Sequence, residues 1–153
     1  MKTAKIIGFF ILSTLFYFSC ESEKLKEIEE PDVPTQDIVN IKWVVKSIVE
    51  NGVANIPEEG FETSYWIVFN SDTTFTGRTR TNDWMGKYEK IDSLATIHIT
   101  QLVSTQVIEF PYGFSYYNSF KNINSFSCQK DTLKLYCNET DYLLFNAYDH
   151  EKE

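Results

Sequence analysis

Few residues of this sequence have the types and spacing that catalysis requires. The two histidines, His98 and His150, have no serine or cysteine partner set out by a motif, and nucleophilic catalysis needs both groups within hydrogen-bond reach. His98 alternates with isoleucines, so we expect it on the wetter face of a strand, and its surroundings show no metal-ligand spacing. Nothing singles out the carboxylates Asp83 and Glu89 as an acid–base pair. We expect no enzymatic activity, no cofactor and no metal site.

The segment "GRTRTNDWMGK" is the best candidate for a binding surface. Arg78 and Arg80 fall on one face of a predicted strand, Asn82 lies in the following turn, and Trp84 comes next. Paired arginines beside a tryptophan suit an anion, a sugar or the carboxylates of a partner. The competing interpretation is a solvated strand face with a buried tryptophan, which is the more common arrangement. Both interpretations remain open from the sequence.

Two further cysteines, Cys128 and Cys137, lie in the last third of the chain. An exported protein favours disulfides, but the predicted register opposes one here. If Cys128 pairs with Leu133, the two cysteines are offset by four residues, or about 13 Å along the strand. A disulfide requires Cα atoms within about 7 Å. We therefore expect two free, buried thiols.

The elements that position these residues are predicted to be mainly strands. Alternating β-branched and aromatic residues predict a strand over 41–49, pairs of strands around 70–72 and 91–93, and three strands after 123, whereas 53–64 has loop composition. Phe114, Tyr117 and Phe120 have helical spacing and predict a helix over 113–122 that packs into the core. The fold class is thus mainly β (α+β): an antiparallel sheet or partly closed barrel of about seven or eight strands with one helix packed on it.

The first residues predict export. A basic start and the apolar run "IIGFFILSTLFYF" match a signal peptide, and the run is too short to span a bilayer comfortably. Ser19 followed by Cys20 is typical of a bacterial lipoprotein, in which the cysteine becomes the lipid attachment site. Such a cysteine carries several acyl chains, which anchor a protein stably in the membrane, whereas a single chain binds only weakly. The expected organisation is a lipoprotein signal peptide (1–19), an acidic flexible tether (20–37), one domain (38–149) and a tail (150–153).

The negative net charge of the chain makes some classes of binding partner unfavourable. The formal net charge is −8, and it becomes more negative once Lys2 and Lys5 leave with the signal. Such a chain repels nucleic acid at long range, so nucleic acid is an unfavourable partner. The acidic run "ESEKLKEIEE" after Cys20 suits either a surface-export signal of Bacteroidetes-type lipoproteins or a plain spacer. We expect attachment to the outer membrane through lipidated Cys20, on the periplasmic side or the cell surface, with an unknown protein or glycan partner.

Several motifs occur in a recognisable order: "IKWVV", then Gly77, Asn82, Gly86 and Tyr88, and finally "DTLKLYCNETDYLLF". Together they resemble the META domain of the HslJ-like lipoprotein family, over residues 41–148. The resemblance implies an antiparallel β structure with a packed helix, a setting in envelope stress, and no established enzymatic activity. Thr81 and Glu109 stand where many members carry cysteines, so a disulfide there is absent. The expected function is a membrane-anchored binding or envelope-stress module; the alternative is a ligand-carrying or inhibitor domain.

Overall fold

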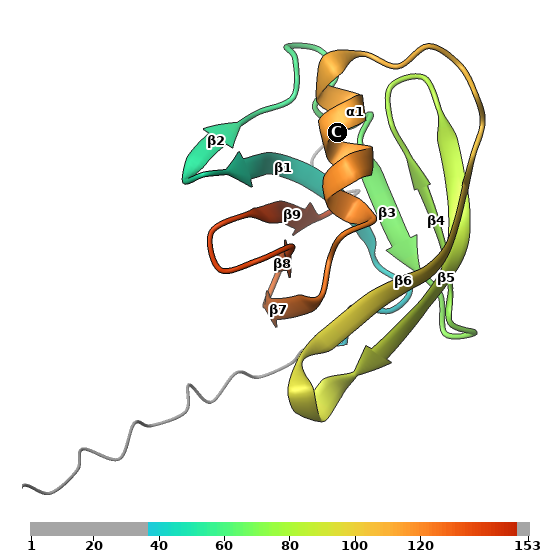
Figure 1. The fold of residues 1–153 in the computed structure, drawn as a ribbon, viewed down its shortest axis with the longest axis vertical. Coiled ribbons are helices and arrows are strands. Elements are labelled where there is room, and N and C mark those ends of the chain that lie inside the picture. The colour runs from blue at the N-terminus through green and yellow to red at the C-terminus, as the bar shows by residue number, and fades with distance from the viewer. Residues whose placement is uncertain (1–36, 150–153) are drawn as a thin grey trace, which may run out of the picture. The chain divides into compact units, whose positions relative to one another are not determined.

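The computed structural model describes residues 37–149, which form a β-barrel with a single α-helix (Figure 1). Predictions on the signal peptide, Cys20, most of the tether and the tail with His150 lie outside the described residues. The elements, in chain order, are β1 (Lys42–Glu50), β2 (Val53–Asn55), β3 (Trp66–Phe69), β4 (Thr74–Arg78), β5 (Asp83–Ile91), a 3-10 helix η1 (Asp92–Leu94), β6 (Thr96–Ser104), α1 (Pro111–Phe120), β7 (Ser125–Gln129), β8 (Thr132–Tyr136) and β9 (Tyr142–Ala147).

Eight of the strands close into an antiparallel barrel. β1 pairs with β3, each strand from β3 to β9 then pairs with the next, and β9 returns to β1 over Trp43–Val49. β2 lies outside this ring, paired with the second half of β1. The predicted mainly β fold with one helix is confirmed. The closure is complete rather than partial, although β6 and β7 share a single residue pair, Thr96 with Ser125.

The turns between neighbouring strands follow the local sequence. Asn51 and Gly52 both have positive φ and join β1 to β2, as type I′ hairpins require. The predicted pairs around 70–72 and 91–93 are β3–β4 and β5–β6, and the three predicted C-terminal strands are β7, β8 and β9. The expectation of a loop over 53–64 is wrong at its start, where β2 forms with all three residues exposed. Pairing with the long β1 overrides the weak local signal.

The interior of the barrel is filled by large side chains. The bulkiest fully buried ones include Trp43, Trp84, Tyr65, Tyr116, Phe69, Phe75, Phe120 and Phe145. Many of these rings meet edge to face, as for Trp84 and Tyr116 at 4.7 Å between centroids, a geometry that aromatic quadrupoles favour. Eight-stranded barrels are just wide enough for side chains to fill. This barrel therefore holds a packed core.

Gly86 allows β5 and β6 to pack closely where the barrel bends. The register shifts between Lys87 and Tyr88, which marks a bulge, and bulges bend and twist the strand that carries them. A Cβ atom on Gly86 would lie 1.8 Å from the backbone oxygen of Gln101. Since real Cβ contacts are never that short, the position requires glycine. Tyr88 then donates its hydroxyl hydrogen bond to the Asn70 backbone oxygen at 2.8 Å.

The helix forms as predicted, but two details of the prediction are wrong. It runs from Pro111 to Phe120 rather than over 113–122, because proline suits the first helical position and keeps the residue before it extended. The expected core stripe is also wrong at Phe114, which is 61% exposed. The buried stripe is Tyr112, Tyr116 and Phe120, at four-residue spacing. These rings enter the barrel, and the ring centroids of Tyr116 and of Phe145 on β9 lie 6.1 Å apart.

Candidate functional site

The structure separates the four residues expected to form a binding surface. Trp84 is 1% exposed and belongs to the barrel core, because it faces inward on β5 together with Tyr88. Arg78 is exposed, and its Nε lies 3.6 Å from Asp83 Oδ1 in a surface ion pair. The surface of Arg78, Arg80, Asn82 and Trp84 therefore does not form as one patch, and the interpretation of a solvated face with a buried tryptophan describes it better.

The guanidinium group of Arg80 packs against two aromatic rings. Its guanidinium carbon lies 3.5 Å from the ring centre of Phe61 and 3.9 Å from that of Phe110. Arginine stacks well on aromatic faces because its guanidinium is planar and weakly hydrated. The side chain thus joins the loop before β3 to the segment that leads into α1. Its role in this structure is to hold two loops together.

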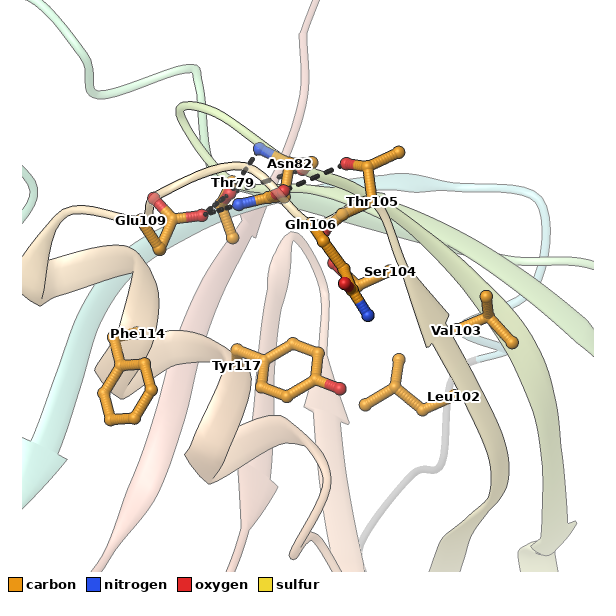
Figure 2. A pocket seen from close by; sticks show the side chains of 10 residues that line it. All are labelled: Thr79, Asn82, Leu102, Val103, Ser104, Thr105, Gln106, Glu109, Phe114 and Tyr117. Carbon is orange, nitrogen blue, oxygen red and sulfur yellow. Dashed lines mark hydrogen bonds between the residues drawn. The ribbon is translucent and has the colours of Figure 1, made fainter.

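Asn82 is a buried hydrogen-bonding centre for the segment between β6 and α1. Its Nδ2 donates to the Val107 backbone oxygen at 3.0 Å and to Glu109 Oε2 at 2.9 Å. Its Oδ1 accepts from the Val107 backbone N–H at 2.8 Å and from Thr105 Oγ1 at 3.0 Å. Both donors and both lone pairs of the amide are therefore used. Figure 2 shows the bonds of Asn82 to Thr105 and Glu109 at the upper rim of a groove.

Glu109 completes this rim and prepares the start of the helix. Its Oε2 accepts a short hydrogen bond from Thr79 Oγ1, and its Oε1 accepts one from the Phe110 backbone N–H at 3.0 Å. A carboxylate beside a helix N-terminus is favourable because the helix dipole is positive there. Gly113 leaves room for it, since a Cβ at that position would lie 2.4 Å from Glu109 Oε1. Glu109 thus links the residues around Asn82 to the start of α1.

Below this rim lies a groove of about 430 Å³, which we call the β6–α1 groove. Its lining comprises Thr79, Asn82, Leu102, Val103, Ser104, Thr105, Gln106, Glu109, Phe114 and Tyr117. In Figure 2, Leu102 to Gln106 form one wall, and Phe114 and Tyr117 project from α1 on the other. This volume lies within the usual range of small-ligand sites.

The groove and the segment between β6 and α1 carry exposed apolar side chains. Val103, Val107, Ile108, Phe110 and Phe114 are between 40% and 92% exposed. Exposed apolar side chains beside a groove make it a candidate for an interaction site. The chain from 93 to 120 contains one formally charged residue, Glu109, and its carboxylate is already bonded to Thr79 and Asn82. The groove therefore suits an uncharged ligand.

The edge of β6 along this groove has unused backbone groups. Beyond the pair of Thr96 with Ser125, β6 has no strand neighbour on the side opposite β5 within residues 37–149. Instead the chain leaves β6, crosses the rim and enters α1, whose backbone approaches β9. This edge was not among the features predicted from the sequence. A readable signal was the absence of charge between 93 and 108.

Three buried polar atoms lie inside the barrel without a hydrogen-bond partner among the described residues: Trp84 Nε1 and the hydroxyls of Tyr112 and Tyr116. Burial raises the pKa of Tyr116 well above that of a free phenol, and nearby Tyr112 adds to the effect. Tyr65 differs, because its hydroxyl donates to Glu58 Oε2 at 2.9 Å. Unlike the buried polar groups of Trp43 and Asn82, which are hydrogen-bonded, these three atoms have no partner among the described residues.

The other expectations about single residues have mixed outcomes. His98 is exposed on β6, as predicted. Cys128 pairs with Leu133, as predicted, and both Cys128 and Cys137 are free. Cys137 is only partly buried, however, and its thiol donates to the Ser119 backbone oxygen at 3.2 Å. Burial raises the pKa of the Cys137 thiol to about 11.

The described part of the chain has neither a candidate metal site nor a candidate membrane-spanning helix. Over residues 37–149, histidine, cysteine and carboxylate side chains do not gather in groups of three or more that could bind a metal ion. Within the same residues, no helix has the length and apolar character needed to cross a membrane.

Comparison with known proteins identifies the fold. No protein-family model and no curated protein matches the chain. Among solved structures, a DUF4847 family protein from Bacteroides vulgatus has a TM-score of 0.58 at 16% identity, with 71% of this chain and 93% of that chain covered. A protein from Burkholderia xenovorans has a TM-score of 0.60 at 18% identity, covering 74% and 85%. At these identities the likeness establishes a shared barrel fold.

Proposed function

We propose that this protein is a non-enzymatic, lipid-anchored module of the bacterial cell envelope that binds a partner through the β6–α1 groove. The observation that carries the binding role is the groove, where exposed apolar side chains surround an unpaired strand edge. The lipid anchor is supported by Ser19 and Cys20 after a short apolar run. The resemblance to the META domain supports an envelope-stress setting.

Acyl labelling tests the anchor. Cells that express the protein are given a radiolabelled or alkyne-tagged fatty acid, and the protein is then isolated. The account predicts label on the parent protein and none on the Cys20→Ser variant, because the cysteine thiol is the attachment point. A matched Cys128→Ser variant should keep the label. Equal labelling of the parent and Cys20→Ser would refute the anchor.

Protease treatment of intact cells then locates the domain. A carboxyl-terminal tag that is lost while a periplasmic control survives would place the domain on the cell surface. A protected tag would place it in the periplasm. The proposed anchor allows either side, and the acidic run after Cys20 suits both an export signal and a spacer.

Site-specific crosslinking tests the groove. A photoreactive residue replaces Phe114, which is 61% exposed beside the groove. The control replaces Leu94, which is 65% exposed on η1. We expect a discrete adduct in intact cells from position 114 and none from position 94. Adducts of equal yield at both positions, or at neither, would contradict a binding role for the groove.

The alternative function, a ligand carrier, has one observation in its favour. Trp84, Tyr112 and Tyr116 each carry a buried polar atom without a partner among the described residues, and a small neutral molecule could supply bonds there. The packed interior argues against it. Native mass spectrometry of the purified protein decides, because a carrier would retain a bound molecule and a packed barrel would show the mass of the chain and its lipid.

A further inference from the structure

We propose that the β6–α1 groove binds an extended, uncharged peptide segment, which pairs with the free edge of β6 as an added strand. This inference rests on the proposed function, because it names the chemical class of the partner at the same groove. Extended peptides bind some other proteins in this way at an exposed strand edge, with backbone bonds supplying affinity and side-chain pockets supplying specificity.

The register shows which backbone groups are available. The Thr105 N–H donates to the Asp83 backbone oxygen at 3.0 Å, so the backbone N–H and C=O groups of Thr105 point toward β5. Backbone groups of successive strand residues point to opposite edges. Those of Leu102 and Ser104 therefore face away from β5. Within residues 37–149 they have no strand partner, and they lie along the groove.

The edge also lacks two of the features that normally prevent strand pairing, namely charged side chains and proline. Natural edges are protected by charged side chains, proline or a covering element. From Thr96 to Ser104 the sequence is TIHITQLVS, which contains no lysine, arginine, carboxylate or proline. Since an edge without charges or proline can serve as a template for pairing, the stretch of β6 beyond its bulge suits a strand partner.

The second wall of the groove can hold side chains of the added strand. Tyr117 of α1 points across the groove toward Leu102, and Phe114 lies farther out on the same helix (Figure 2). Phe114 is exposed, and Val103 on β6 is 56% exposed. Side chains of a bound strand alternate between the two faces of the sheet, so one set would cover Phe114 and the other set would cover Val103. A strand edge on one wall and an aromatic helix face on the other define a slot for one extended chain.

Charge and bulk select among possible occupants. The protein's own segment 20–37 is rich in glutamate and would bring its charges into a lining whose only formal charge, Glu109, is negative and already bonded. A second copy would present β6 together with its own α1 and barrel, and two helices would then compete for one slot. An uncharged segment of another protein brings neither charge nor bulk.

The test uses a synthetic strand with one usable edge. The probe is a short capped peptide of alternating valine and serine, N-methylated on every valine, which cannot grow into larger sheets because one edge is blocked. The control peptide is N-methylated on every residue, so neither edge can pair. Binding to the full-length protein is measured by nuclear magnetic resonance titration, with Phe114→Ser and Ser104→Pro as groove variants and Leu94→Ser as the matched surface control.

We expect the one-edged peptide to bind the parent and Leu94→Ser equally, and the fully methylated peptide not to bind. Phe114→Ser and Ser104→Pro should each weaken binding by about tenfold, which corresponds to the loss of roughly one good contact. Proline at 104 removes an N–H that faces away from β5, so the ladder to β5 is kept.

Several results would overturn the inference. Equal binding of both peptides would show that backbone pairing is not used, and unchanged binding of both variants would place the site elsewhere. A β6-mediated dimer in sedimentation would assign the edge to a second copy. If position 114 crosslinks in cells while the one-edged peptide does not bind, the proposed binding role stands and the peptide inference fails. If neither occurs, both fail.

Discussion

Replacing Asn82 with alanine should loosen the whole rim of the groove. The side chain is 6% exposed and makes five hydrogen bonds, one to Thr81 and four to Thr105, Val107 and Glu109. Each such bond contributes about 0.5–1.5 kcal/mol net, and water reaches some of the partners once they are released, since Thr105 and Val107 are exposed. We expect the free energy of unfolding to fall by about 2–4 kcal/mol.

The assay is urea unfolding followed by tryptophan fluorescence, in which the midpoint should fall while the slope stays constant. The matched control is Asn124→Ala. Asn124 is exposed, and its Nδ2 makes one bond, to the Cys137 backbone oxygen at 2.8 Å. We expect a loss below about 1 kcal/mol there. If Asn82→Ala costs no more than Asn124→Ala, the rim is not held by Asn82 and the reasoning is wrong.

Three further outcomes follow from local geometry and burial. Gly86→Ala should destabilise the protein by more than about 3 kcal/mol in the same assay, because the new Cβ collides with the Gln101 backbone oxygen, whereas Gly60→Ala, with open space and a positive φ, should cost about 1 kcal/mol. The Cys137 thiol, with its pKa raised to about 11, should react with iodoacetamide at pH 8 far more slowly in the folded than in the urea-unfolded protein; equal rates would contradict its burial. Burial raises the pKa of Tyr116, so its contribution to stability is complete below about pH 10, the unfolded value, and is lost above it; a urea midpoint that did not fall between about pH 9 and pH 11 would contradict this.

The strands could be predicted because their signals are local. Turn residues such as Asn51 and Gly52 adopt the positive φ that their types favour, and alternation placed Cys128 opposite Leu133 correctly. Closure of the barrel could not be predicted, because the pairing of β1 with β9 joins segments far apart in the chain. The short β2 depends in the same way on β1 rather than on its own residues.

The candidate site was harder to predict for two physical reasons. Phe120 belongs to two aromatic stripes on the helix, one through Phe114 and one through Tyr116. Spacing alone therefore did not decide which of these two residues enters the barrel. The inward direction of Trp84 was available in principle, since Trp84 and Tyr88 lie four residues apart on one strand and share a face. The free edge of β6 depends on where the chain turns into α1, which no local pattern encodes.

Amide hydrogen exchange of the full-length protein, with and without the one-edged peptide, tests the central claim most directly. A strand added to β6 accepts hydrogen bonds from the amides that face away from β5. The account predicts new protection at Leu102 and Ser104, with little change at Val103, whose amide already faces β5. Protection confined to α1 or the barrel interior, or no new protection at a saturating peptide concentration, would contradict the claim that the free edge of β6 is the binding site.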